Sequence, residues 1–423
     1  MRHGRTLLVV RHLAVAAAAV ALLLDAPMSA VAETLAVRGD VVHTMTGPPL
    51  TDGVVVIENG KIRAVGPAAT TAIPPTAKLL RGAVVTPGLV DAHSVVGLAG
   101  HLNQPQDQDQ LDPGEAIQPE LRAIDAYNPQ ERLIEWLRGF GVTTIHTGHA
   151  PGALVAGQTM VVKLSGNTVE EAVLVPAAMV AATLGDSTRP QGEDADKKSP
   201  GTRSKAVAML RAEFVKTREY LRKRTLADES KRPDTDLRLE ALAGVLAGKV
   251  PLLVTADRAH DIASALRIAA EFRLRLVLDS AAESYLLVDR IKAAGVPVII
   301  HPTMRRSGGG GAETENLSFE TAARLAEAGI PIALQSGYES YVPKTRVVLF
   351  EAGLAAAHGL SFEKALAAIT IDAARIIGVA DRVGSLEVGK DGDVAIYDGD
   401  PFEYTTHCTG VVINGAVMSS EPR

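Results

Sequence analysis

Residues 250–279 read VPLLVTADRAHDIASALRIAAEFRLRLVLD, and this stretch decides the fold class. Its two ends, 250–255 and 274–279, are short apolar runs of the length that a buried strand has. Between them, residues 261–272 repeat apolar side chains at the three- and four-residue spacing of an amphipathic helix. A strand, a helix and a second strand in succession predict two parallel strands joined by a helical crossover.

The same alternation recurs along the middle of the chain. Short apolar runs at 141–147, 296–301 and 330–335 are each preceded by a helical pattern. With about eight such units over roughly 300 residues, we expect an α/β fold with a closed (β/α)8 barrel of the TIM type. An open doubly wound sheet is the alternative, because periodicity alone does not show whether a sheet closes.

Both ends of the chain have β character. Residues 35–65 contain two strand-like runs with a hairpin signal at Asn59-Gly60, and the C-terminal residues return to short runs with Gly and Asn-Gly turns. We therefore expect residues 33–86 and 383–423 to pair as one small β-sandwich. Residues 87–382 are expected to form the barrel.

The first 32 residues have the pattern of a signal peptide. A basic lead of Arg and His residues ends at His12, an apolar run spans 13–24, and Ala30-Val31-Ala32 forms a small-x-small cleavage site. We expect cleavage after Ala32 and a periplasmic or secreted product. An uncleaved anchor is the alternative, but the run is short and Asp25 follows it directly. No other stretch reaches the ~20 apolar residues of a membrane span.

Composition narrows the classes of partner and chemistry. The 423 residues carry a formal net charge of −6, with a pI near 6.0, which argues against nucleic acid as a main partner. Cys408 is the single cysteine, so an intrachain disulfide and a thiolate metal cluster are both excluded.

One motif carries a family resemblance. Residues 86–98 read TPGLVDAHSVVGL, with Asp91, His93 and Val95 at alternate positions. The stretch resembles the metal-site opening of the amidohydrolase superfamily, where a strand ends in Asp-x-His-x-His and both histidines bind one metal ion. GVTTIHTG at 141–148, ADRAHDIASALRIAAEF at 256–272 and RVGSLEVGKDGDVAIYDGDPF at 382–402 extend the resemblance along the mature chain. It is closest to the imidazolonepropionase-like branch.

The resemblance also implies that most metal ligands are missing. His93 matches the first histidine, and Val95 replaces the second. Thr255 and Ser280 stand where relatives commonly carry metal-binding histidines, and the region of Gln335 and Ser336 offers no counterpart to their strand-end aspartate. Ala181 stands nearest to the position of a carboxylated lysine. A catalytic zinc site needs about three protein ligands, so a metal-dependent mechanism of the family's kind is doubtful.

Other polar residues at predicted strand ends provide candidates for a rebuilt site, because barrel enzymes carry their chemistry at the carboxyl ends of the strands. The candidate catalytic residues are His93, His301, Asp257 and Asp279. The candidate metal ligands are His93, His146, His149 and His301, for one divalent cation such as zinc. A metal-free acid–base site is a second interpretation. In a third, these are separate polar groups that cap strand ends.

The resemblance implies a hydrolase that acts on a non-peptide carbon–nitrogen bond of a small substrate, such as a cyclic amide. The alternative is a catalytically inactive barrel that binds a ligand or a protein in the periplasm. A metal-free hydrolase or isomerase that uses His301 or His146 is a third hypothesis. We expect a small-molecule partner, no nucleic acid and no membrane span after signal cleavage. Related barrels often form homo-oligomers, but no interface can be identified from the sequence.

Overall fold

The computed structural model describes residues 34–102, 104–188, 200–301, 316–338 and 347–423. The chain divides into two units, Met1–Glu33 and Thr34–Arg423, and all described residues belong to the second. The predicted signal peptide, including its cleavage site, therefore lies outside the described residues. Within the described ranges, no helix is long and apolar enough to cross a membrane.

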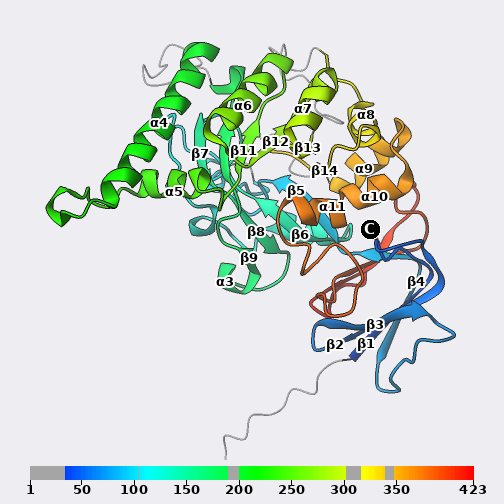
Figure 1. Ribbon diagram of the computed structural model, residues 1–423. Helices are drawn as coiled ribbons and strands as arrows, with labels where there is room; N and C mark the ends of the chain where they lie inside the picture. The colour runs from blue at the N-terminus through cyan, green and yellow to red at the C-terminus, as the bar shows by residue number, and fades with distance from the viewer. Residues whose placement is uncertain (1–33, 103, 189–199, 302–315, 339–346) are drawn as a thin grey trace, which may run out of the picture. The chain divides into compact units, whose positions relative to one another are not determined.

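The two ends of the described chain pair in one seven-stranded sheet (Figure 1), with the strand order β17-β16-β15-β4-β1-β2-β3. Strand β15 joins the ends because it runs antiparallel to β4, with Val394 opposite Pro87. A separate hydrophobic cluster that includes Leu35, Ile57 and Val412 packs within this sheet. Its strands are β1 (Thr34–Val42), β2 (Leu50–Glu58), β3 (Lys61–Pro67), β4 (Lys78–Pro87), β15 (Val394–Tyr397), β16 (Cys408–Ile413) and β17 (Ala416–Ser419).

The predicted parallel strands are present in the middle of the chain. A six-stranded sheet has the order β14-β13-β12-β11-β10-β7; β10 to β14 run parallel to one another, whereas β7 runs antiparallel to β10. The apolar runs expected at 250–255, 274–279, 296–301 and 330–335 correspond to β11 to β14, which confirms them. The strands are β7 (Val155–Gln158), β10 (Val180–Thr183), β11 (Leu252–Thr255), β12 (Leu276–Ser280), β13 (Val298–Ile300) and β14 (Ile332–Leu334).

A four-stranded sheet, β5-β6-β8-β9, departs from the expected strand–helix alternation. Strands β5 and β6 are parallel, but β8 runs antiparallel to β6, and only Thr159 separates β7 from β8. An isolated bridge links Ser94, at the end of β5, to Gly337, just after β14. The strands are β5 (Leu89–Ser94), β6 (Val142–Thr147), β8 (Met160–Lys163) and β9 (Val173–Val175).

Helices alternate with the parallel strands along the chain and lie on their outer side (Figure 1). Helix α6 buries Ile262, Leu266 and Ala269 along one face, and its C-cap residue Arg273 has a left-handed φ of 58°. The helices are α2 (Arg132–Arg138), α3 (Val169–Ala172), α4 (Arg203–Arg224), α5 (Leu237–Leu246), α6 (Ala259–Phe272), α7 (Val288–Ala294), α8 (Thr321–Glu327), α9 (Val348–Ala357), α10 (Phe362–Ala368) and α11 (Ile371–Ile376).

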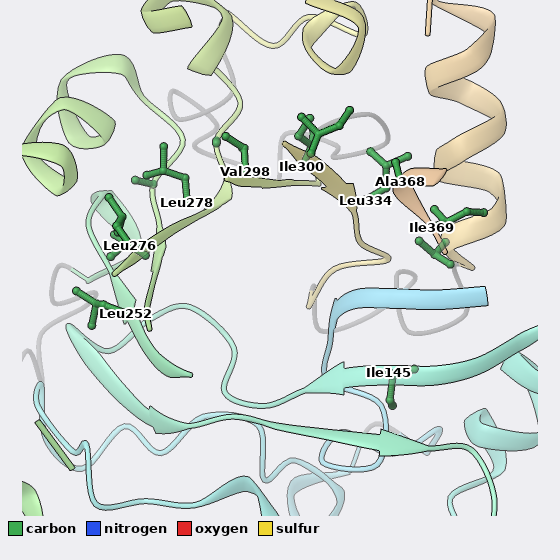
Figure 2. Packing of buried hydrophobic residues seen from close by; sticks show 14 of the residues in the cluster. Ile145, Leu252, Leu276, Leu278, Val298, Ile300, Leu334, Ala368 and Ile369 are labelled. Atoms are coloured by element: carbon green, nitrogen blue, oxygen red, sulfur yellow. The ribbon is translucent and has the colours of Figure 1, made fainter. Parts of the chain in front are cut away.

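The parallel strands bury both of their faces, as their continuous apolar runs predict. One set of alternating residues packs in the main cluster, where Figure 2 shows Leu252, Leu278, Ile300 and Leu334. The other set lies in a second cluster, against residues of α11 and the segment that follows it; from the strands it contains Leu253, Val277, Ile299 and Ala333. Because side chains alternate along a strand, every second residue faces this second cluster.

A buried ionic cluster connects β8 to the C-terminal part of the chain. The Lys163 ammonium lies 2.6 Å from Asp391 Oδ2 and 3.0 Å from Asp393 Oδ1, and it also donates to Asn414 Oδ1. Asp391 has further partners in Lys61, at 2.5 Å, and Arg382, at 2.8 Å. The exposed fraction of the Lys163 side chain is 2%.

Candidate functional site at the strand ends

The strand register brings polar side chains to the end of the second cluster. Thr255 is the register partner of Asp279, and Asp279 is the partner of Ile299. The second-cluster residues of β11 to β14 are each followed, two positions later, by a polar residue on the same face of the strand. These polar residues are Thr255, Asp279, His301 and Gln335. These positions lie at the carboxyl ends of their strands, where α/β barrels place their chemistry.

The centre of this group is a buried histidine–carboxylate pair. The Nδ1 atom of His93, on β5, lies 2.9 Å from Oδ1 of Asp279, on β12, and both side chains are almost fully buried. Oδ1 of Asp279 also accepts from Gln335 Nε2 at 2.7 Å, and its Oδ2 accepts from Thr255 Oγ1 at 2.6 Å. Both carboxylate oxygens of Asp279 are therefore engaged, which fixes its orientation.

This pairing shifts the pKa of both partners. Burial lowers the pKa of His93, but the charge and hydrogen bond of Asp279 outweigh burial and raise the pKa above its usual value. Burial raises the pKa of Asp279, but the charge of His93 and the three hydrogen bonds hold it below its usual range. Each group therefore favours the charged form of the other.

A second carboxylate lies beside this pair, also on β5. Asp91 Oδ1 accepts from the backbone N–H of Ser336 at 3.0 Å and of His93 at 3.3 Å, and its Oδ2 accepts from the Ser336 hydroxyl. Burial raises the pKa of Asp91 to about 6, although these hydrogen bonds oppose the shift. Two carboxylates near one histidine thus have pKa values that are pushed in opposite directions, which is typical of acid–base sites.

The other candidate histidines have different environments. His146 Nδ1 lies 2.7 Å from the carbonyl of Ala92, and its Nε2 lies 2.6 Å from the Thr159 hydroxyl. Donation from Nδ1 to the carbonyl leaves Nε2 as the acceptor, so His146 is neutral, and burial lowers its pKa to about 3. Burial also lowers the pKa of His149 to about 4, and neither of its ring nitrogens makes a well-aligned hydrogen bond.

Asp257 and His301 have contacts with other residues at these strand ends. Asp257 Oδ1 accepts from the Ser280 hydroxyl at 2.6 Å and from the Ala282 backbone N–H at 3.4 Å. The ring centroids of His301 and Tyr338 are 5.3 Å apart, and the ring centroids of Tyr338 and His93 are 5.5 Å apart. Of the four catalytic candidates, His93 and Asp279 are in direct hydrogen-bonding contact.

The four candidate metal ligands do not form a ligand set. Among the described residues, no group of three or more His, Cys, Asp or Glu side chains is placed to hold a metal ion. Val95 contributes no donor and packs in a small apolar cluster with Ala99, Ala150 and Tyr338. The donor set at these strand ends therefore does not fit a divalent metal, which needs about three protein ligands in a catalytic zinc site.

Sequence reasoning missed three residues of this site. Gln335 was considered only as a missing carboxylate, yet its amide donates to Asp279. Thr159 bonds His146 from the strand connection between β7 and β8, and Tyr338 packs between two histidines. The available signal was the two-residue spacing from apolar strand positions, which places Gln335 on the same face as Asp279.

Comparison with known proteins identifies the family. The model of the amidohydrolase family matches residues 131–418. A solved amidohydrolase from Thermotoga maritima superimposes with a TM-score of 0.84 at 30% identity, over 90% of this chain and 99% of that one. The imidazolonepropionase of Fusobacterium nucleatum is 25% identical over 393 residues, which span 85% of this chain and 88% of that protein. The Syntrophobacter fumaroxidans imidazolonepropionase is 33% identical over 162 residues, a match covering 38% of this chain and 36% of its own length. The chain belongs to the amidohydrolase family.

Proposed function

We propose that the protein hydrolyses a carbon–nitrogen bond, other than a peptide bond, in a small cyclic amide. The observation that carries this proposal is the buried His93–Asp279 pair at the carboxyl ends of β5 and β12. Family membership supports a hydrolase, and the relatives in Fusobacterium and Syntrophobacter are named for an imidazolone, which is a cyclic amide. These comparisons favour a hydrolase over an inactive binding module.

The site would lie at the mouth of a closed (β/α)8 barrel. The Ser94–Gly337 bridge and the Gly337 N–H, which lies 3.3 Å from the His93 carbonyl, connect the free edge of β5 to the end of β14. The short step through Thr159 likewise connects the two sheets on their other side. The likeness to the Thermotoga structure supports this closure.

The chain's own residues supply a reasonable acid–base set for amide hydrolysis. In this reaction the oxygen of water bonds to the amide carbon, the carbon–nitrogen bond breaks, and a proton passes to the departing nitrogen. His93, held through Nδ1 by Asp279, has its Nε2 outside any well-aligned hydrogen bond and would donate a proton or hydrogen-bond the amide oxygen. Asp91, with a pKa of about 6, would accept the proton of the water.

A panel of five- and six-membered cyclic amides tests the proposal. The products, an amine and a carboxylic acid on one opened ring, are followed by liquid chromatography with mass detection. We expect ring opening by the wild-type protein and its loss in His93→Gln, while His260→Gln, at an exposed helix position, keeps the activity. Ring opening that is equal in wild type and His93→Gln, or absent across the panel, would count against the proposal.

Export remains a prediction. The expected cleavage after Ala32 and the periplasmic or secreted location rest on residues outside the described structure. N-terminal sequencing of the protein expressed with its own leader tests both, since it should begin at Glu33. The divisions at residues 87 and 383, and assembly into a homo-oligomer, likewise stay predictions.

A further inference from the structure

The strand ends that resemble a family metal site are occupied by a network of hydrogen bonds. Where the resemblance places lost ligands, three hydroxyl side chains each donate to a carboxylate: Thr255 to Asp279, Ser280 to Asp257, and Ser336 to Asp91. A hydroxyl that donates to a carboxylate stabilises its charge, as a bound cation would. The three contacts follow one pattern at three strand ends.

Both carboxylate oxygens of Asp279 accept hydrogen bonds from donors that belong to the chain. His93 and Gln335 both direct an N–H at Oδ1, and Thr255 directs its hydroxyl at Oδ2. A metal ion would have to displace these donors from a side chain with no measurable exposure. The Gln335 amide nitrogen donates to Asp279 Oδ1 and cannot serve as a metal ligand.

We infer that the hydrogen-bonded cluster of His93, Asp279, Thr255 and Gln335 replaces the metal centre, and that Thr255 and Gln335 are positioning residues for the His93–Asp279 pair. This inference rests on the proposed function for its catalytic meaning. It predicts a site that takes up no divalent metal and works in the presence of a chelator.

One substitution turns the cluster into a possible ligand set. Gln335→Glu places a carboxylate beside Asp279 and His93, which gives three ligands, the number in a catalytic zinc site. Without metal, the two carboxylates repel each other, because Gln335 Nε2 now lies 2.7 Å from Asp279 Oδ1. We expect Gln335→Glu to melt at a lower temperature than wild type and to be restabilised by zinc.

The experiment compares zinc binding by the wild-type full chain, by Gln335→Glu and by the control Gln158→Glu. The control makes the same change of charge on β7, where the Gln158 side chain donates a hydrogen bond to the Pro119 carbonyl. Plasma mass spectrometry and titration calorimetry with zinc chloride are the readouts. We expect no stoichiometric zinc in wild type or in the control, and a gain in Gln335→Glu. One zinc per wild-type chain, lost in His93→Ala, would overturn the inference even if Gln335→Glu does not fold.

The positioning role has its own readout. In protein with 15N-labelled histidine, Thr255→Val should move the side-chain resonance of His93 and change the pH profile of ring opening, whereas Thr255→Ser should restore both. An unmoved His93 resonance in Thr255→Val would contradict the role. The two proposals can fail separately. If ring opening occurs but requires zinc, only the inference of a metal-free cluster is overturned. If the protein neither opens the rings nor binds zinc, only the proposed function is overturned.

Discussion

Replacing Lys163 with methionine should remove the charge at the centre of the buried ionic cluster while keeping a side chain of similar length. Lys163 Nζ lies 2.6 Å from Asp391 Oδ2 and 3.0 Å from Asp393 Oδ1. The substitution affects the two carboxylates differently. Asp391 keeps its contacts with Lys61 and Arg382, whereas Asp393 keeps a hydrogen bond from the backbone N–H of Asn414.

The loss of stability depends on whether the Asp393 carboxyl stays charged or takes up a proton. Breaking a buried ion pair on one side costs about 3–5 kcal/mol, because a buried charge loses its compensation. Burial already raises the pKa of Asp393, so the carboxyl can take up a proton instead. Protonating an ordinary carboxyl at pH 7 costs about 4 kcal/mol, which sets the upper limit. We therefore expect Lys163→Met to lower the free energy of unfolding by about 3–4 kcal/mol.

Urea unfolding at pH 7, followed by circular dichroism, measures the change against wild type. The double variant Lys163→Met/Asp393→Asn separates the two contributions, because it removes the uncompensated carboxylate together with the lysine. It should recover much of the lost stability. A loss below about 1 kcal/mol in the single variant, or a double variant that is no more stable than the single one, would refute this reasoning.

The same buried ionic cluster should make the free energy of unfolding decrease at acid pH. Although burial opposes the shift, the hydrogen bonds from Lys163, Lys61 and Arg382 lower the pKa of Asp391 from 3.8 to about 2. Because the folded-state pKa is depressed, the stabilisation is complete above pH about 4 and is lost as the pH falls towards 2, a total of about 2 kcal/mol. Lys163→Met should show a weaker pH dependence of the urea midpoint between pH 4 and 2.

Three further predictions concern single side chains. Burial lowers the pKa of His146 from 6.5 to about 3, so the stability contributed by neutral His146 is complete above pH 6.5 and is lost as the pH falls towards 3. In wild type the urea midpoint should therefore decrease between pH 7 and 5, and His146→Gln should make this decrease smaller. An equal decrease in both proteins would contradict this. Gly337→Ala would place a Cβ 2.1 Å from Nε2 of His301 at a φ of +88°, whereas Gly378→Ala, at a φ of +81°, meets nothing within 4 Å. The first should cost more stability than the second and should also impair ring opening, and equal melting temperatures would show that the His301 contact is unimportant. Phe214 is fully buried on α4, so Phe214→Ala should lower the free energy of unfolding by about 3–5 kcal/mol, and a urea midpoint close to wild type would contradict that packing.

The periodic parts of the fold could be predicted because the pattern itself causes the structure. The run at 274–279 becomes β12 because alternate residues such as Val277 and Leu278 are buried on opposite faces. The antiparallel β7 and β8 could not be predicted in this way. A strand that turns at Thr159 and pairs with two different sheets has the same local pattern as any other short apolar run.

The candidate site was only partly predictable, because sequence order does not reveal which strand ends meet. His93 and Asp279 were both candidates, and the structure places them in contact although 186 positions separate them. His146 had the same residue type and a similar position after a strand, but the Ala92 carbonyl and Thr159 hydroxyl engage its ring. Which partner a buried histidine finds depends on register and packing, and neither is encoded locally.

The backbone at the end of β12 indicates that Asp279 is held in place. Ser280 and Ala281 are buried and have left-handed φ values of 64° and 53°, a conformation that costs residues other than glycine about 1 kcal/mol or more each. The turn is held because the Ser280 hydroxyl donates to Asp257 and the Ala282 N–H reaches the same carboxylate. A scaffold that had lost its chemistry could relax this turn, or place glycine there, without loss. Strain next to the carboxylate that pairs with His93 is the pattern expected of a working site, and it supports the proposed hydrolase over an inert barrel.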